Sequence, residues 1–398
     1  MEGYNKKVIM SYWTICRMKT TKKIYVKVSI IFLLGGILLF SSCEKEENQK
    51  IEANRKTLFM YLPWSSNLTN YFYNNISDLE KCITKIGLNN EKVIVFISTG
   101  STEAMMFEIV SSHGRCKREI LKKYKSPPFT TIDGITAILN DVKAFAPASV
   151  YTMIIGCHGM GWLPVYEMKV RSAPHMKMHW EYQGVPLTRY FGGLTAEYQT
   201  DIKSLASGIA NAGMKMEYIL FDDCYMSSIE VAYELKDVTK YLIGSTSEMM
   251  AYGMPYAAIG EYLLGNPDYQ SGCEEFYNFY STYEIMPCGT LAVTDCSELE
   301  NMAAIIKSIN SKYSFDKSLR GTIQRLDGYT PVIFYDFADY ITSLCNDPIL
   351  LNQFREQLNH LVPYKTHTKN FYTMAKGIIP INTFSGITTS DPSDNPMT

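Results

Sequence analysis

Compact apolar runs that alternate with amphipathic helical segments constrain the fold of this chain most strongly. The strand-like runs are Thr57–Pro63, Lys92–Thr99, Glu103–Val110, a run from Ser149 into Gly156, Tyr218–Asp223 and Lys240–Thr246. The helical patterns between them are Leu68–Ile86, Thr131–Ala146, Thr200–Ala212 and a stretch from about Ser227. Such alternation predicts βαβ units, and apolar runs without polar alternation indicate strands buried on both faces. We therefore predict an α/β fold with a mostly parallel sheet sandwiched by helices.

The chain of 398 residues is long enough for one large domain or two of ordinary size. We place the core at residues 56–255. Residues 256–398 mix helical and strand-like runs, and we expect them to form a C-terminal extension packed on the sheet. Between 163 and 199 a proline-containing stretch shows no period, and a loop that long in a compact domain is usually functional or mobile. The last residues end without a closing element, which favours a truncated chain.

Residues 1–43 follow the order of a secretory signal: a lysine-bearing start, an apolar run at Val28–Phe40 and small residues before Cys43. The apolar run is shorter than the roughly 20 residues that a membrane span needs. The ending resembles that of a bacterial lipoprotein signal, in which Cys43 becomes the lipidated first residue. An ordinary signal peptide or an uncut signal anchor is the alternative.

The charged residues 44–55 are predicted to form a tether. Their acidic start resembles the export tag of surface-exposed lipoproteins in some Gram-negative bacteria. We therefore expect an exported outer-membrane or cell-surface lipoprotein of a Gram-negative bacterium, held to the membrane by the lipid at Cys43. The net charge of −2 gives no reason to expect a nucleic acid partner.

The ten cysteines contain no CxxC pair, so we expect no structural zinc site. Their irregular spacing does not predict a disulfide framework, although an exported chain could form disulfides. Most are expected to be buried as small hydrophobic side chains.

Two predicted strands end in reactive side chains, one at His158 and the other at Cys224. In open α/β sheets, ligands sit at the carboxyl ends of the strands. If the two strands are parallel neighbours, His158 and Cys224 lie at the same edge of the sheet. The pair is the minimum for thiol catalysis, because the imidazole takes the thiol proton and the thiolate attacks. Cys224 also stands just before a predicted helix, whose dipole would favour the thiolate.

A thiol nucleophile also needs two backbone N–H groups that stabilise the oxyanion of the tetrahedral intermediate. Gly159 can bring its N–H close without obstruction by a side chain, and the N–H of Cys224 is the natural second donor. The alternative for His158 is a turn residue between glycines. Cys157 would point away from His158 on a strand, so we predict no metal site there.

Four segments resemble the clostripain-like cysteine peptidases, relatives of caspases, gingipains and legumains with a caspase-like α/β fold. They are "IIGCHGMGW", "LFDDCYMSSIEVAYEL", "TLFMYLPWSSNL" and "IGSTSEMMAYGMPY". The resemblance covers roughly residues 57–385. It implies that His158 is the catalytic histidine and Cys224 the nucleophile, and it places Asn67, Ser245 and Thr246 at positions that bind substrate.

The resemblance also implies cleavage after Arg or Lys, since the family attributes this preference to an acidic residue two before the cysteine, here Asp222. Residues two apart on a strand face the same way, so Asp222 and Cys224 can line one pocket, where a carboxylate would pair with a basic side chain. Two alternatives stay open: Asp222 pairs with a structural arginine, or Asp223 caps the following helix. Residues 248–254 depart from the family pattern, a change that we expect to reshape the substrate groove.

Family members are often inactive precursors that cut themselves between the histidine and the cysteine. The candidate cut sites here are Lys169, Arg171, Lys177 and Arg189. The resemblance implies peptide or protein substrates and no cofactor for the chemistry. Some relatives respond to calcium, but the sequence contains no EF-hand or dense acidic loop. We expect a monomer. The alternative function is a non-catalytic binding module on the cell surface with the same fold.

Overall fold

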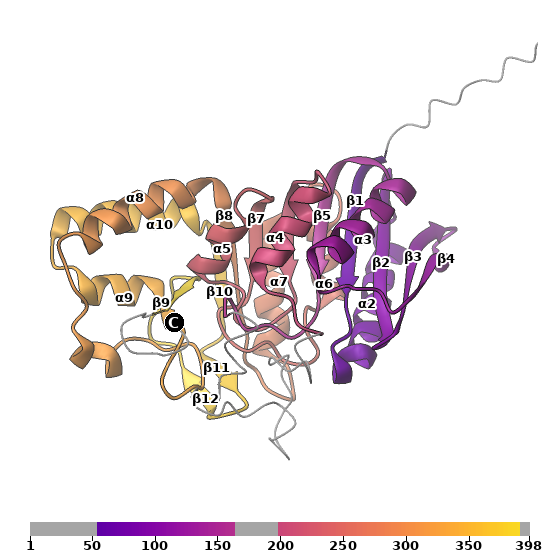
Figure 1. Cartoon of the computed structure of the whole chain (residues 1–398). Helices are drawn as coiled ribbons and strands as arrows, with labels where there is room; N and C mark the ends of the chain where they lie inside the picture. Colours follow the sequence, from indigo (N-terminus) through magenta and orange to yellow (C-terminus); the bar gives the residue numbers. More distant parts are fainter. Residues whose placement is uncertain (1–53, 164–197, 391–398) are drawn as a thin grey trace, which may run out of the picture. The chain divides into compact units, whose positions relative to one another are not determined.

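Nine strands form one sheet in the computed structural model, which describes residues 54–163 and 198–390. The strands are β1 (Asn54–Leu62), β2 (Glu91–Gly100), β3 (Glu103–Ser112), β4 (Arg115–Lys125), β5 (Ala148–Ile155), β6 (Met216–Phe221), β7 (Thr239–Gly244), β8 (Thr290–Asp295) and β10 (Tyr364–His367). Their order in the sheet is β10-β8-β7-β6-β5-β1-β2-β3-β4 (Figure 1). Residues 1–53, and with them the predicted signal peptide, Cys43 and most of the tether, lie outside the described residues.

The five central strands of the sheet are parallel. β1 pairs with β2 and β5, β5 with β6, and β6 with β7, all in parallel. The two strands at each edge are antiparallel to their neighbours. The predicted α/β fold with a mostly parallel central sheet is confirmed.

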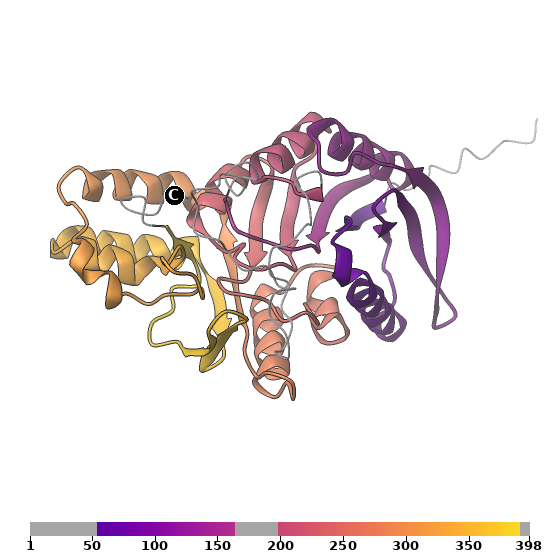
Figure 2. The same ribbon diagram turned by 60° about the horizontal axis from the view of Figure 1, so that its bottom comes forward.

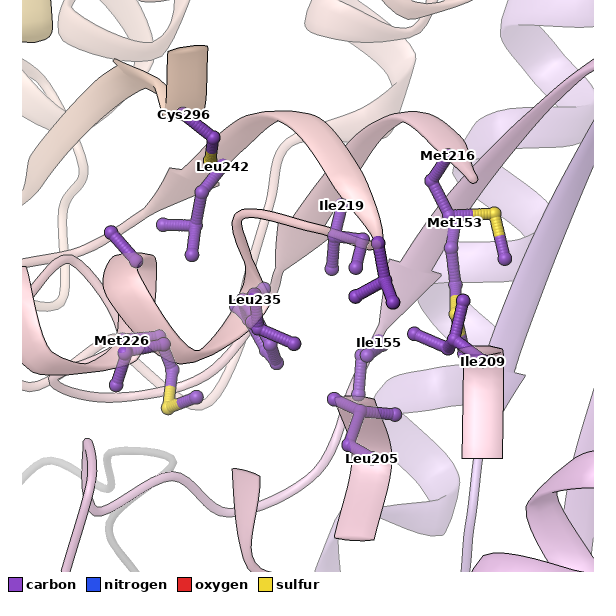
Figure 3. Close-up of a cluster of buried hydrophobic side chains, with 14 of the residues drawn as sticks. Met153, Ile155, Leu205, Ile209, Met216, Ile219, Met226, Leu235, Leu242 and Cys296 are labelled. Carbon is purple, nitrogen blue, oxygen red and sulfur yellow. The ribbon is translucent and has the colours of Figure 1, made fainter. Parts of the chain in front are cut away.

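Helices cover both faces of this sheet, as Figure 2 shows. One face packs against α2 (Thr69–Ile86), α6 (Tyr256–Leu263) and α7 (Tyr269–Ser281), and Leu58 and Met60 of β1 point into that layer. The other face carries α3 (Ile132–Phe145), α4 (Ile202–Asn211) and α5 (Ile229–Leu235). Figure 3 shows part of this second layer, where Ile155 of β5 and Ile219 of β6 meet Leu205 and Ile209 of α4. Burial on both faces is the reason why these strands read as continuous apolar runs.

The segment after residue 255 contributes to the same sheet. Its strands β8 and β10 extend the sheet beyond β7. It also holds α8 (Leu299–Asn310), α9 (Phe337–Leu344) and α10 (Pro348–Leu361), together with two short strand pairs, β9 (Tyr335–Asp336) with β13 (Thr388–Thr389) and β11 (Asn370–Thr373) with β12 (Gly377–Pro380). Asn54–Thr398 therefore groups as one compact unit by its contacts.

The sequence analysis missed β4, which has no apolar period because it is an exposed edge strand rich in lysine and arginine. Charged edge strands are a common defence against edge-to-edge pairing. β1 begins at Asn54, so the last two residues of the predicted tether belong to this strand. The eight cysteines of the described segments are free thiols, and all except Cys116 and Cys157 are buried, as predicted for most of them. In the described part of the chain, no helix is both long and apolar enough for a membrane span.

Candidate active site

The carboxyl ends of β5 and β6 bring the two predicted catalytic side chains to one edge of the sheet. The strands are parallel neighbours, and Ile155 pairs with Phe221 in their register. His158 follows Ile155 by three residues, and Cys224 follows Phe221 by three residues. The parallel pairing on which the sequence argument depended is therefore present.

Gly159 shows how closely the two loops approach each other. A Cβ atom at this position would clash with the carbonyl oxygen of Cys224 and lie 2.8 Å from the Asp223 Cβ and 3.0 Å from the Cys224 nitrogen. Contacts that short leave no room for a side chain, so the position requires glycine. The backbones of the histidine loop and the cysteine loop thus lie in direct contact.

His158 is 9% exposed, and its Nε2 lies 3.0 Å from Oδ1 of Asn67. Asn67 is exposed in the 3-10 turn η1 (Ser66–Leu68) that follows β1, the other parallel neighbour of β5. The structure thus places Asn67 against the histidine, whereas the resemblance implied a role in substrate binding. Three adjacent parallel strands supply Asn67, His158 and Cys224.

Cys224 is completely buried, and its sulfur is covered by the loop after β7. The backbone N–H of Met249 donates to Sγ across 3.1 Å. The expectation that Cys224 stands just before a helix is wrong, because α5 begins only at Ile229 and its N-cap is Ser228. The helix dipole acts within the first turn, so it contributes nothing at Cys224.

Asp222 is 1% exposed, and both oxygens of its carboxylate accept hydrogen bonds from the segment after β7. Oδ1 accepts from the N–H of Met254 at 2.8 Å, and Oδ2 accepts from the hydroxyl of Tyr256 at 2.9 Å. Asp222 and Cys224 both belong to the layer of α2, α6 and α7, as expected of residues two apart. The pocket predicted around Asp222 is therefore filled by the chain's own loop in this structure.

Asp223 does not cap a helix, in contrast to the alternative left open by the sequence. Its carboxylate accepts the backbone N–H of Cys157 and lies 3.4 Å from the sulfur of Cys157. It thereby joins the loop after β6 to the loop after β5. A buried carboxylate that accepts backbone N–H groups restrains both loops.

Ser245 and Thr246 are fully buried behind the cysteine loop. The Oγ of Ser245 lies 2.8 Å from the Thr290 hydroxyl, and the Oγ1 of Thr246 lies 3.0 Å from it. The carbonyl oxygen of Ser245 accepts the backbone N–H of Ser227 at 2.9 Å. In this structure Ser245 contacts the cysteine loop through Ser227, and both residues contact Thr290 of β8. Their predicted role in binding substrate stays a prediction.

A cavity lies beside the histidine, on the face of the sheet covered by α4. Its polar lining includes Cys157, His158 and Asp223, and Trp64 and Leu205 are among its apolar walls. Neither Cys224 nor Asp222 lines it. The described segments hold no cluster of three or more His, Cys, Asp or Glu side chains that could bind a metal ion. The four candidate self-cleavage sites, Lys169, Arg171, Lys177 and Arg189, lie outside the described residues.

The sequence analysis did not identify two further residues at this site. Glu248 is 4% exposed and accepts a hydrogen bond from the hydroxyl of Tyr225, which directly follows Cys224. The signal in the sequence that points to Glu248 is an acidic residue in an otherwise apolar loop.

A cysteine and a histidine at the ends of adjacent parallel strands, on a caspase-like sheet, are the arrangement expected of a cysteine peptidase. Residues 60–379 match the model of the clostripain family, Peptidase_C11. The chain belongs to this family of cysteine peptidases, which confirms the resemblance inferred from its motifs.

Solved structures of C11 proteases are similar to this chain. A secreted C11 cysteine protease from Bacteroides thetaiotaomicron, "iotapain", is 58% identical, with 87% of this chain and 95% of that chain covered and a TM-score of 0.80. A clostripain from Bacteroides thetaiotaomicron ATCC 29148, in complex with the peptide inhibitor BTN-VLTK-AOMK, is 66% identical over 52% of this chain and 93% of that chain, with a TM-score of 0.51. An inactive zymogen C11 protease from Parabacteroides distasonis shares the fold at 24% identity, covering 85% of this chain and 92% of that chain, with a TM-score of 0.71. No curated protein matches the chain.

Proposed function

We propose that this cysteine peptidase is an endopeptidase that cuts after lysine or arginine with Cys224 as nucleophile and His158 as base. The observation that carries the proposal is the register of β5 and β6, which sets the two residues at equivalent positions beyond Ile155 and Phe221. The contact of Gly159 with the Cys224 backbone supports it, because the attacking atom and the oxyanion donors must lie within one small site.

The contact with Asn67 supports distinct roles for the two imidazole nitrogens. Oδ1 of an amide only accepts, so Nε2 of His158 donates to it. The neutral ring then carries its lone pair on Nδ1, which takes the thiol proton. Asn67 thus orients the base, as second partners of catalytic histidines do.

In the proposed reaction, the Cys224 thiolate attacks the carbonyl carbon of the scissile bond. The N–H groups of Gly159 and Cys224 stabilise the oxyanion. The C–N bond breaks, the leaving amine takes the proton from His158, and a thioester remains on Cys224. Water then attacks the thioester with His158 as base, which releases the acid and restores the thiol. These steps need no cofactor. A dependence on calcium rests on the family resemblance alone.

The preference for basic residues rests on Asp222, on the same face as Cys224. A buried carboxylate pairs strongly with an ammonium or guanidinium group that reaches it. The inhibitor of the 66% identical clostripain is named BTN-VLTK-AOMK, and the peptide letters of that name end in K. This agrees with a lysine before the cut.

The buried thiol and the occupied Asp222 carboxylate support an inactive precursor. Cys224 has no exposed surface, and Met254 and Tyr256 hold the carboxylate that would bind the substrate. We propose that self-cleavage in the 163–199 loop, at Lys169, Arg171, Lys177 or Arg189, releases residues 249–256 from Cys224 and Asp222. Cys224→Ala protein should stay uncut alone and be cut when wild-type protein is added. Self-cleavage of the Cys224→Ala protein alone would exclude Cys224 as the nucleophile.

We propose that the protein is exported and anchored through a lipid at Cys43. The order of residues in the signal supports this, and the 58% identical relative is described as secreted. Cys43→Ser should move the protein from the membrane fraction to the soluble fraction and remove the mass of the lipid. Membrane attachment that survives this change would contradict the anchor.

The function is tested with purified protein that lacks residues 1–43, by turnover of a peptide library in which the residue before the cut varies. The proposal predicts cleavage after Lys and Arg that requires Cys224. A protein that turns over no peptide, with or without calcium and after limited proteolysis of the loop, would favour the non-catalytic binding module instead.

A further inference from the structure

Tyr225, the residue directly after Cys224, has a backbone conformation that bulky side chains rarely adopt. Its φ is +62°, in the left-handed region. The other non-glycine residues with positive φ in the described segments are Asn90, His113 and Ser126, all exposed. Tyr225 is fully buried. Such strain persists only where the surroundings hold the residue in place, and it concentrates at functional sites.

Three contacts hold Tyr225 in this conformation. Its hydroxyl donates to Oε1 of Glu248 at 2.9 Å, and its backbone N–H donates to the carbonyl oxygen of Ser247 at 3.1 Å. Its ring stacks on Phe334, with centroids 4.9 Å apart and planes 12° apart. The hydroxyl, the ring face and the backbone N–H of Tyr225 are therefore each held by a partner.

Glu248 connects this ring to the rest of the site. Its second oxygen, Oε2, accepts the backbone N–H of Met374 at 3.0 Å. It also directly precedes Met249, whose N–H contacts the sulfur of Cys224. A single buried carboxylate thus joins the cysteine loop, the loop after β7 and the C-terminal part of the chain.

The aromatic side chains behind Tyr225 also touch the histidine loop. A Cβ atom on Gly161, which has a φ of +60°, would lie 2.9 Å from the ring of Phe334. The hydroxyl of Tyr329 lies 3.1 Å from the sulfur of Met160. The turn that carries both rings is shaped by Asp327, whose carboxylate accepts backbone N–H groups, including those of Tyr329 and Phe334.

We propose that Tyr225, Glu248 and Phe334 are positioning residues that set the backbone N–H of Cys224 for the oxyanion. The C-terminal segment, which supplies Phe334, then helps to position the active site. The inference rests on Cys224 being the nucleophile. Catalysis needs the oxyanion donors placed to within about 0.5 Å, and the loss of one such donor costs about 100- to 1000-fold in kcat. A substitution of a positioning residue that displaces the Cys224 N–H should therefore lower kcat by part of that factor.

The test compares Tyr225→Phe and Glu248→Gln with Tyr218→Phe. Tyr218 is the matched control, because it is also fully buried and its hydroxyl donates to a carbonyl oxygen, that of Leu263, at 3.1 Å. The probes are a peptide substrate ending in lysine, the corresponding peptide aldehyde, and iodoacetamide. The Cys224 sulfur adds to the aldehyde carbon and the thiol proton ends on the new hydroxyl, whose oxygen occupies the oxyanion site.

We expect Tyr225→Phe and Glu248→Gln to lower kcat by about ten- to hundredfold with little change in KM, and to weaken aldehyde binding by a similar factor. Alkylation of the activated enzyme by iodoacetamide should change by less than about threefold, because it needs no oxyanion donor. Tyr218→Phe should keep kcat and aldehyde affinity, whatever its effect on the unfolding midpoint. Unchanged kcat and aldehyde affinity in the two variants would overturn this inference but leave the proposed function intact. An aldehyde adduct on a residue other than Cys224 in the wild-type enzyme would overturn the proposed function as well.

Discussion

The backbone N–H of Met249 donates to the sulfur of Cys224 across 3.1 Å. Met249 is itself buried, so the loop after β7 both contacts the thiol and shields it from solvent. The same loop occupies Asp222 through Met254. The groups that must meet a substrate are therefore engaged by residues 249–256, and the proposed activation has to displace these residues while Glu248 keeps its contacts.

The first prediction concerns the reactivity of the covered thiol. In protein whose four candidate cut sites are changed to glutamine, Cys224 should react with iodoacetamide at least about tenfold more slowly than in cleaved wild-type protein, because a reagent reaches a buried thiol only after local opening. Peptide mass spectrometry of timed samples measures the rate. Cys157, which is half-buried, is the internal control and should react alike in both proteins. Equal rates at Cys224 would contradict the shielding.

The second prediction concerns Asn67, which orients the imidazole. Asn67→Ala should lower kcat by roughly tenfold or more with little effect on KM, because the ring loses the partner that fixes its tautomer and its plane. Asn67 is exposed, so the unfolding midpoint should not change. Asn70→Ala, an exposed change on the neighbouring α2, is the control. A loss confined to KM would instead support the role in substrate binding that the resemblance implied.

The third prediction separates the charge of Asp222 from its hydrogen bonds. Asp222→Asn should lower kcat/KM for lysine and arginine substrates by roughly ten- to hundredfold, the worth of one hydrogen bond to a charged group. Tyr256→Phe removes the hydroxyl that Oδ2 accepts but leaves the charge, so it should keep the preference for basic residues. The measurement is kcat/KM for peptides with lysine or glutamine before the cut. An Asp222→Asn enzyme with an unchanged ratio would refute the pocket role.

The fourth prediction concerns stability at alkaline pH. Burial raises the pKa of the Cys82 and Cys288 thiols from 9.0 to about 11 and that of Cys273 and Cys296 to about 12. The unfolded chain therefore loses thiol protons first. Each thiol's contribution to the free energy of unfolding is fully present below pH 9 and is lost as the pH rises through 11 to 12. Between these limits only the unfolded state ionises, and the contribution falls by about 1.4 kcal/mol per pH unit.

Lys56 acts in the opposite direction. Desolvation lowers its pKa from 10.5 to about 8. The buried ammonium therefore destabilises the folded state below pH 8, and this destabilisation disappears as the pH rises to 10.5. Burial also lowers the pKa of Lys365, but four thiols outweigh these two lysines, and the free energy of unfolding in urea should decline above pH 9. Cys288→Ala should make that decline shallower, because alanine does not ionise. A stability that stays level or rises from pH 9 to pH 11 would contradict these pKa shifts.

The sequence predicted the parts of the site that depend on strand order. Apolar runs fix which strands are buried, and reactive residues at their carboxyl ends identify His158 and Cys224. The sequence could not show that β8 and β10 join the sheet, because antiparallel edge strands do not require the crossover helix by which parallel strands are recognised in a sequence. It also could not show that Asn67 faces the histidine, because that contact depends on the order of β1, β5 and β6 in space.

The backbone strain at Tyr225 and the burial of Glu248 also could not be predicted from the sequence. A φ of +62° on a tyrosine contradicts local preference, and the ring on which it stacks, Phe334, lies more than a hundred residues along the chain. Glu248 in turn is held by the N–H of Met374. A glutamate in a loop is usually exposed. Only its partners on both sides explain why this one is buried.

The most direct test of the account is peptide mapping of activated protein after reaction with a thiol-directed covalent probe that carries lysine at its reactive end. We expect one adduct, on Cys224, which is lost in Cys224→Ala protein. We also expect much slower formation of the adduct in His158→Ala protein. An adduct on another cysteine, or an activated wild-type protein that forms none under reducing conditions, would contradict the account.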